Sequence, residues 1–279
     1  MLSVVRISFV VYLLTTWQPF NVQQTIDHFE SLFTPTQTLQ RGVGSRDLTF
    51  AGLLVIPDPT FPTGPVQTLS TEAWADTLNA KILGTIATTQ AFLRTISEYR
   101  SRLVFLTPAT TYSIQPPFHS AEVTVLGALD GFIASLRGEL ATLGLHVCNI
   151  KMGAFEVTGN TQALQALGQS ETFSWSGYAR TLYAQNFLSQ EQQINGLGSR
   201  RRKGTHLREL NNAVFDAISS TSPWSTVRVG RGSIAYALLG SLVPPSLIRW
   251  MLGLRRVPYE HHVLDRQSES LQWERVEKV

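Results

Sequence analysis

Short apolar runs alternate along this chain with longer segments of helical period, and this alternation constrains the fold more than any other feature. Each of the four runs has the length of a buried strand. Short strands joined by helices are typical of parallel β-α-β units, so the pattern predicts an α/β fold with a parallel sheet. The predicted strands are residues 48–56, 102–106, 146–150 and 227–229.

The segment 71–99 has the pattern of one long helix, straight or kinked. Its apolar side chains recur at intervals that place most of them on one side of a helix. Ser70 or Thr71 is positioned to cap the first turn. The apolar residues are Ala73, Trp74, Leu78, Ile82, Ile86, Phe92 and Ile96.

The segment 121–143 predicts a second helix, whose single apolar face must pack on a sheet. Gly144 follows it and is placed to end the helix before the next strand. We predict a third helix at 207–218 and two short apolar helices at 234–239 and 247–252. The apolar face of the second helix carries Val125, Leu129, Phe132, Leu136 and Leu140.

The composition divides the chain into three parts. Residues 1–47 form a hydrophobic segment and a helix, or the truncated start of a Rossmann sheet; residues 48–255 form the α/β domain; residues 256–279 are a polar tail. Inside the domain, residues 155–206 are polar without a clear period, which favours a lid, an interaction surface or a disordered loop. We interpret the run 200–203, Arg-Arg-Arg-Lys, as solvated loop rather than a contact for phosphates, acidic partners or anionic lipid.

The overall composition is that of a globular protein. With 43% hydrophobic and 15% charged residues, the chain can bury a sizeable core. The formal net charge of +3 gives no electrostatic footprint for nucleic acid, so we predict no nucleic-acid partner. The single cysteine, Cys148, excludes an intramolecular disulfide, which favours an intracellular protein. The histidines show no spacing that indicates a metal site.

The apolar run 7–14 follows Arg6 much as the core of a signal peptide follows its charged start. The run is too short to span a bilayer as a helix, and no small-residue cleavage site follows it. We therefore favour a buried strand, or an imprecise start of the coding sequence, over membrane contact through residues 4–17. The predicted location is cytoplasmic, with membrane association through this segment as the alternative.

Several segments, taken in order, are similar to short-chain dehydrogenases/reductases across residues 48–255. The family's fourth helix is matched by ADTLNAKILGTIATTQAFL, its fifth strand by RLVFLTP, and its active-site helix and sixth strand by ALDGFIASLRGELATLGLHVCNIKMGAF. The strings LLVIPDPTFPTGP, PPFHSAEVTV and KGTHLRELNNAVFDAI resemble, more narrowly, a fungal short-chain-dehydrogenase-like family of unknown function. The resemblance implies an incomplete Rossmann-like fold, which is a doubly wound parallel sheet.

In that family a tyrosine hydroxyl exchanges a proton with the substrate. A lysine four residues later binds the cofactor ribose and lowers the pKa of the tyrosine. The resemblance places Glu122 at the tyrosine position and Leu126 at the lysine position. The serine position falls between Pro108 and Thr110, where Thr110 is the only hydroxyl, and the helical asparagine position falls on Lys81.

A dinucleotide fold also needs a glycine-rich turn after its first strand, where backbone amides approach the pyrophosphate. The chain contains neither Gly-x-x-x-Gly-x-Gly nor Gly-x-Gly-x-x-Gly. Either the protein lacks this loop, or the sequence is a fragment or has a misread start.

Two functions remain open. In the first, the chain is a non-catalytic binding or scaffolding module that needs no cofactor and pairs as a homodimer through the helix at 121–143. In the second, it is a divergent NAD(P)-dependent oxidoreductase acting on a carbonyl or an alcohol. We favour the first, because the second requires several altered positions to be compensated at once. Glu122 is interpreted as a helix-start glutamate, with a buried general acid or an ion pair to Lys81 as alternatives.

Overall fold

The computed structural model describes residues 50–57, 60–109, 113–155, 175–199 and 205–251. The predicted N-terminal segment with its membrane alternative, the Arg-Arg-Arg-Lys run and the polar tail lie outside these ranges. Thr110 also lies outside them, whereas Lys81, Glu122 and Leu126 lie inside.

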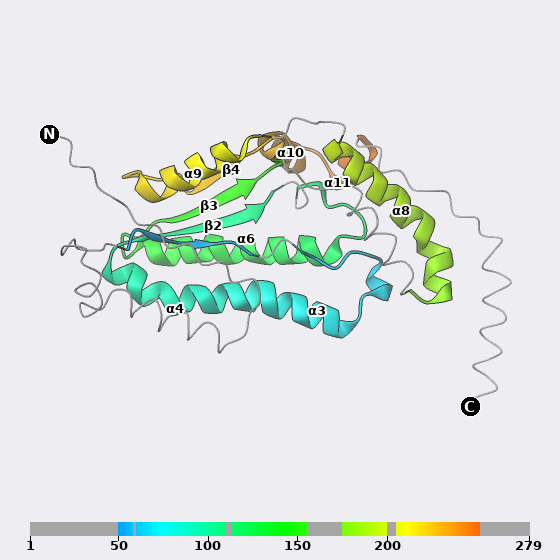
Figure 1. Ribbon diagram of the computed structural model, residues 1–279, viewed down its shortest axis with the longest axis horizontal. Coiled ribbons are helices and arrows are strands. Elements are labelled where there is room, and N and C mark those ends of the chain that lie inside the picture. Colours follow the sequence, from blue (N-terminus) through cyan, green and yellow to red (C-terminus); the bar gives the residue numbers. More distant parts are fainter. Residues whose placement is uncertain (1–49, 58–59, 110–112, 156–174, 200–204, 252–279) are drawn as a thin grey trace, which may run out of the picture.

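A sheet of four parallel strands forms the centre of the described structure, and its strands follow one another in chain order (Figure 1). Backbone pairing places Leu103 beside Val147, and Ile150 beside Val227. Each strand overlaps one of the four predicted runs, so the predicted parallel α/β fold is confirmed. The strands are β1 (Gly52–Val55), β2 (Arg102–Pro108), β3 (Val147–Met152) and β4 (Thr226–Val229).

Helices cover both faces of this sheet (Figure 1). One face is covered by α4 (Gly84–Glu98) and α6 (Ser120–Ala141), and the other by α9 (Leu207–Ser219). Successive side chains of a strand alternate between the faces, so Leu103 packs toward α4 and α6 while Val104 packs toward α9. Because both faces are buried, the strands read in the sequence as nearly continuous apolar runs.

The predicted helix at 71–99 is present, with a local change of pitch. α3 (Thr71–Leu78) continues into a π-helical turn, η2 (Asn79–Leu83), and then into α4. The Ser70 hydroxyl accepts a hydrogen bond from the Ala73 N–H at 3.1 Å, which confirms one of the two predicted caps. The π turn holds more residues than an α-helical turn and therefore shifts the helical phase between α3 and α4.

The end of α6 is also as predicted. Gly144 adopts a φ of 71°, a left-handed conformation that favours glycine, and so ends the helix. The Leu145 N–H then donates to the carbonyl of Leu140 at 3.0 Å, which satisfies one of the last helical carbonyls. A short 3-10 turn, η1 (Val66–Thr68), precedes α3.

One prediction is wrong: the polar segment 155–206 is not loop throughout, because it contains α8 (Gly177–Ser199). Phe187 on this helix is fully buried. Its ring centroid lies 5.1 Å from that of Trp175 and 5.6 Å from that of Phe118, both in edge-on geometry. A few aromatic contacts therefore hold a helix whose remaining composition is polar.

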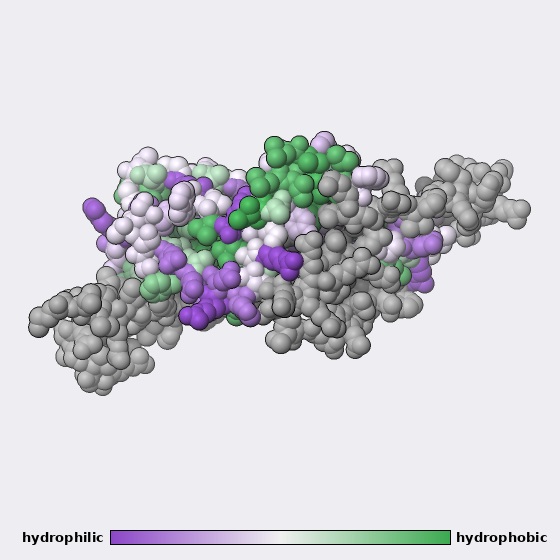
Figure 2. Space-filling view, turned by 90° about the horizontal axis from the view of Figure 1, so that it is seen from above, coloured by the Kyte–Doolittle hydropathy of each residue, from purple (hydrophilic) through white to green (hydrophobic). Residues whose placement is uncertain are grey.

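Two apolar helices follow β4 and overlap the predicted ones: α10 (Ser233–Leu242) and α11 (Pro245–Met251). The start of α10 is anchored by Ser233, which is buried and whose hydroxyl donates to the carbonyl of Gly230 at 2.8 Å. Figure 2 shows hydrophobic residues gathered in one area at the place that α10 and α11 occupy in Figure 1.

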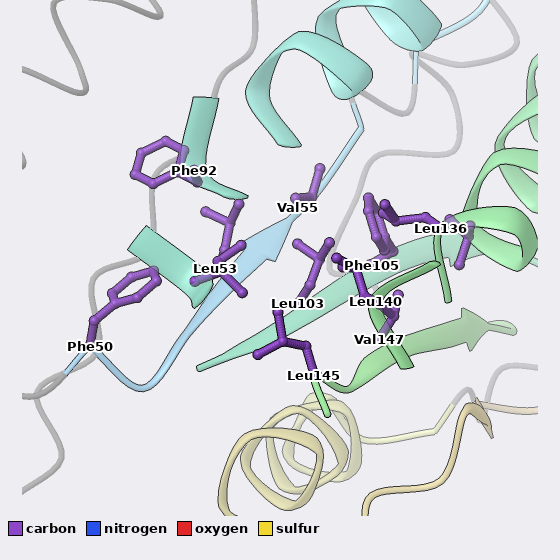
Figure 3. Packing of buried hydrophobic residues seen from close by; sticks show 12 residues of the cluster. Phe50, Leu53, Val55, Phe92, Leu103, Phe105, Leu136, Leu140, Leu145 and Val147 are labelled. Atoms are coloured by element: carbon purple, nitrogen blue, oxygen red, sulfur yellow. The ribbon is translucent and has the colours of Figure 1, made fainter. Parts of the chain in front are cut away.

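The larger hydrophobic cluster lies between the sheet and the helices α4 and α6 (Figure 3). Side chains from β1, β2 and α6 point toward one another there. The rings of Phe105 and Phe132 meet edge-on with centroids 6.3 Å apart. The cluster comprises Phe50, Leu53, Val55, Phe92, Ile96, Leu103, Phe105, Ile133, Leu136, Leu140, Leu145 and Val147.

Candidate functional site

The carboxyl ends of β2 and β3 lie together, at the end of an open α/β sheet where such folds bind their ligands. Ala109, directly after β2, donates its N–H to the carbonyl of Met152 at the end of β3, at 2.8 Å. α6 begins beyond β2 at Ser120, and the π turn η2 packs against α6. The structure therefore brings together the elements that carry Lys81 and Glu122.

Glu122, in the first turn of α6, pairs with His119. The Nδ1 of His119 lies 3.2 Å from the Oε2 of Glu122, and both side chains are mostly buried. The helix dipole stabilises a carboxylate in a first turn. His119 is a partner of Glu122 that was not among the sequence-based alternatives.

Lys81 lies in the π turn and is buried. Its Nζ is 4.5 Å from the ring centroid of Phe61, a distance at which an aromatic face attracts a cation. The Lys81 carbonyl accepts a hydrogen bond from Thr85 Oγ1 at 2.7 Å. An ammonium taken out of water needs compensating partners, and Phe61 is one of them.

Leu126 is part of the hydrophobic interior. It is buried on α6 beside Val125 and one turn before Leu129. A leucine side chain has no donor or acceptor, so this position cannot hydrogen-bond a ribose hydroxyl as the family lysine does.

A polar network that the sequence reasoning missed joins β2, β3 and α6. Thr107 Oγ1 donates to Asn149 Oδ1 at 2.8 Å, and Asn149 Nδ2 donates to Asp130 Oδ1 at 3.2 Å. The second carboxylate oxygen of Asp130 accepts from Lys151 Nζ. A signal for this network exists in the sequence, because Asn149 and Lys151 are two residues apart in a strand and must share a face.

Two buried oxygens have no hydrogen-bond partner among the described residues: Ser120 Oγ and Gln190 Oε1. Ser120 is the first residue of α6, two positions before Glu122. Buried polar atoms are nearly always hydrogen-bonded, so the Ser120 hydroxyl lacks a partner that such an atom ordinarily has. Among the same residues, no group of three His, Cys, Asp or Glu side chains is arranged to hold a metal ion.

Comparison with known proteins relates this fold and site to a family. The profile of the fungal family of unknown function DUF1776 matches residues 7–249. The chain belongs to this family. Retinol dehydrogenase 16 from Mus musculus is 26% identical over 227 residues, which are 80% of this chain and 69% of that protein.

Two solved structures share the fold of this DUF1776 chain at 13% identity. A short-chain dehydrogenase from Streptomyces avermitilis gives a TM-score of 0.53, covering 94% of this chain and 77% of its own. A short-chain dehydrogenase family protein from Francisella tularensis subsp. tularensis SCHU S4 gives a TM-score of 0.54, covering 78% of each chain. The predicted Rossmann-like fold of short-chain dehydrogenase type is thereby confirmed.

The described residues of the DUF1776 chain do not fit the nicotinamide cofactor of short-chain dehydrogenases where the family lysine would bind the ribose. Leu126 fills that position and is packed into the interior. In the sequence, Ile56, Pro57 and Asp58 take the place of the Asn-Asn-Ala-Gly element that the resemblance expects after the strand. We assign no chemical step through such a cofactor.

Proposed function

We propose that the chain is a non-catalytic short-chain-dehydrogenase-like protein that acts as a binding or scaffolding module. The observation that carries this proposal is the buried Leu126 at the lysine position. A proton donor at Glu122 would serve a redox reaction only if a cofactor were held beside it. The group that would bind the cofactor ribose and support proton transfer is replaced by a hydrocarbon side chain.

The charged side chains around the site positions support the same proposal, because Glu122, Lys81 and Asp130 each have a structural partner. Glu122 pairs with His119 at the start of α6. Lys81 lies over an aromatic ring, and Asp130 ties α6 to Lys151 of β3. These contacts hold helices to the sheet, which is what a fold kept for binding requires.

The Ser120 hydroxyl supports a binding role at this end of the sheet. It is buried and has no partner among the described residues. A ligand with one hydrogen-bonding group would satisfy it, and the net gain of a neutral hydrogen bond is about 1 kcal/mol. The ligand chemistry that this single group favours is therefore a small polar molecule or a peptide group.

The proposal is tested by titrating the full chain with NADH and with NADPH while following tryptophan fluorescence and the melting temperature. We expect no saturable change with either cofactor. A short-chain dehydrogenase that has the Tyr-x-x-x-Lys pair, titrated in parallel, is the positive control. Saturable binding in the micromolar range would overturn the proposal in favour of the divergent oxidoreductase. In that case Glu122→Gln should abolish turnover and leave cofactor binding intact.

We further propose that the module forms a homodimer through α6. The exposed side of this helix carries small residues at steps of three and four. A Cβ atom added at Gly131 or at Gly138 would meet no other atom within 4 Å, so a second helix can approach closely. The small residues are Thr124, Ala128, Gly131, Ser135 and Gly138.

Sedimentation velocity of Gly131→Trp tests this pairing. The indole fits into open space in one subunit but clashes in a close helix pair, so we expect the wild type to sediment as a dimer and the variant as a monomer. Gly177→Trp is the matched control, because a Cβ there also meets no atom within 4 Å and the residue lies on α8. A monomeric wild type, or a dimeric Gly131→Trp protein, would contradict the pairing.

A further inference from the structure

Two helices near the end of the described chain expose a contiguous apolar surface (Figure 2). Isolated apolar side chains on a surface are ordinary, but a contiguous group marks a contact site. The exposed fraction reaches 79% for Leu242 on α10 and 63% for Trp250 on α11. We call this group the α10–α11 surface; it consists of Ile234, Leu238, Leu242, Leu247 and Trp250.

Contacts on the side of α10 that faces the protein fix the orientation of this helix. Ser233 is buried and hydrogen-bonded to Gly230, which anchors the first turn. Gly240 lies so close to the loop after β2 that a Cβ atom there would be 3.1 Å from the carbonyl oxygen of Ser113. The three residues of α10 in the surface recur at four-residue steps and share the side of the helix that faces the solvent.

The stretch of chain that carries this surface has charge of one sign. Residues 217–251, the described stretch that ends with α11, contain three arginines and neither aspartate nor glutamate. Since the whole chain carries +3, the rest of it carries 3 − 3 = 0. Arg231 is exposed shortly before α10. The arginines are Arg228, Arg231 and Arg249.

We propose that the α10–α11 surface docks on an anionic lipid bilayer, with both helices lying along the interface. Interfacial helices combine a large apolar face with basic residues, and tryptophan is enriched at this depth of the membrane. In the part of the chain that the structure describes, no helix is long and apolar enough to cross a bilayer, so the contact is with one leaflet. A second copy on this surface would bring arginine-rich segments face to face.

The test is cosedimentation of the full chain with vesicles of phosphatidylcholine and phosphatidylserine, and with vesicles of phosphatidylcholine alone. We expect binding to the anionic vesicles that weakens as salt is raised, because the lipid charge is screened. Leu238→Glu/Leu242→Glu should lower the partition coefficient by about tenfold or more, since two apolar contacts are lost and two negative charges are added. Leu242→Glu alone, at the more exposed position, should give a smaller loss in the same direction.

Leu143→Glu is the matched control: Leu143 is 63% exposed and follows α6, at the opposite end of the sheet from α10. This variant should bind vesicles as the wild type does, and far-UV circular dichroism should show the same helix content in all variants. Equal binding by the double variant and the wild type would overturn the proposal, as would binding to neither vesicle. Self-association that the double variant abolishes, without vesicle binding, would assign the surface to a second copy instead.

Discussion

Asp130 is the residue on which the buried network depends, and its replacement by leucine has a calculable effect. Asp130→Leu leaves Asn149 Nδ2 without its acceptor inside the protein, which costs about 1–3 kcal/mol. It also leaves the ammonium of Lys151 without this carboxylate. Breaking a fully buried ion pair costs about 3–5 kcal/mol.

The second contribution is smaller here, because the side chains of Lys151 and Asp130 are 14% and 24% exposed and the lysine can move its ammonium toward water. A contribution of about 1 kcal/mol is therefore reasonable. Together the two effects predict a loss of about 2–4 kcal/mol in the free energy of unfolding, a large share of the stability of a typical domain.

Urea unfolding followed by tryptophan fluorescence measures this loss, provided that the slope of the transition is unchanged. Glu98→Leu is the matched control, since it removes a carboxylate from an exposed pair with Arg94 on a helix and should cost less than about 0.5 kcal/mol. Adding Lys151→Met to Asp130→Leu should restore part of the lost stability, because it removes the ammonium that no longer has the Asp130 carboxylate beside it. An Asp130→Leu protein as stable as the control variant would refute the role assigned to the network.

Three further predictions concern other positions of the sheet. Gly153→Ala should destabilise the protein by about 1–3 kcal/mol in urea unfolding, because its Cβ would lie 2.5 Å from the backbone oxygen of Arg231; an unchanged midpoint would contradict this close approach. Arg102→Met should lower the free energy of unfolding by about 1–2 kcal/mol in the same assay, because the guanidinium donates to two carbonyls in the last turn of α9. An unchanged midpoint would contradict a role of Arg102 in capping this helix. Burial raises the pKa of the Cys148 thiol from 9.0 to about 11, so the folded state keeps a proton that the unfolded state releases, and stability should fall as pH rises from 9.0 to 11. Cys148→Ala should remove that part of the decline, and identical pH profiles of the two proteins would contradict the shift.

The strands and the helices beside them could be predicted because their signals are local. β2 and β3 are buried on both faces and therefore read as apolar runs, and the helical spacing of α6 survives in its sequence. α8 could not be predicted, because its apolar stripe is narrow. Its stabilising partner Phe118 lies far away in the chain, so no local window contains the contact with Phe187.

Counting along the matched segments assigned Lys81, Glu122 and Leu126 to the family's site positions, but counting does not give the partners that these side chains have in the fold. Phe61 is set by tertiary geometry, because it reaches Lys81 from the loop before η1. The pair of His119 and Glu122 is local, three residues apart, and was overlooked in the sequence. The π turn also contributed, because it changes the direction of every side chain after it relative to a regular α-helix, and Lys81 lies inside that turn.

The chain order of the strands has a consequence for synthesis on the ribosome. Because β1, β2, β3 and β4 are neighbours in the order in which they are made, each strand emerges next to a partner that already exists. The longest stretch of chain between two successive strands separates β3 from β4. While that stretch is being synthesised, β3 is the edge strand of the sheet. An unpaired apolar edge invites pairing with another nascent chain, and charged or polar side chains discourage it. Asn149 and Lys151 interrupt the apolar run of β3, so the residues that bind α6 also make this temporary edge strand more polar.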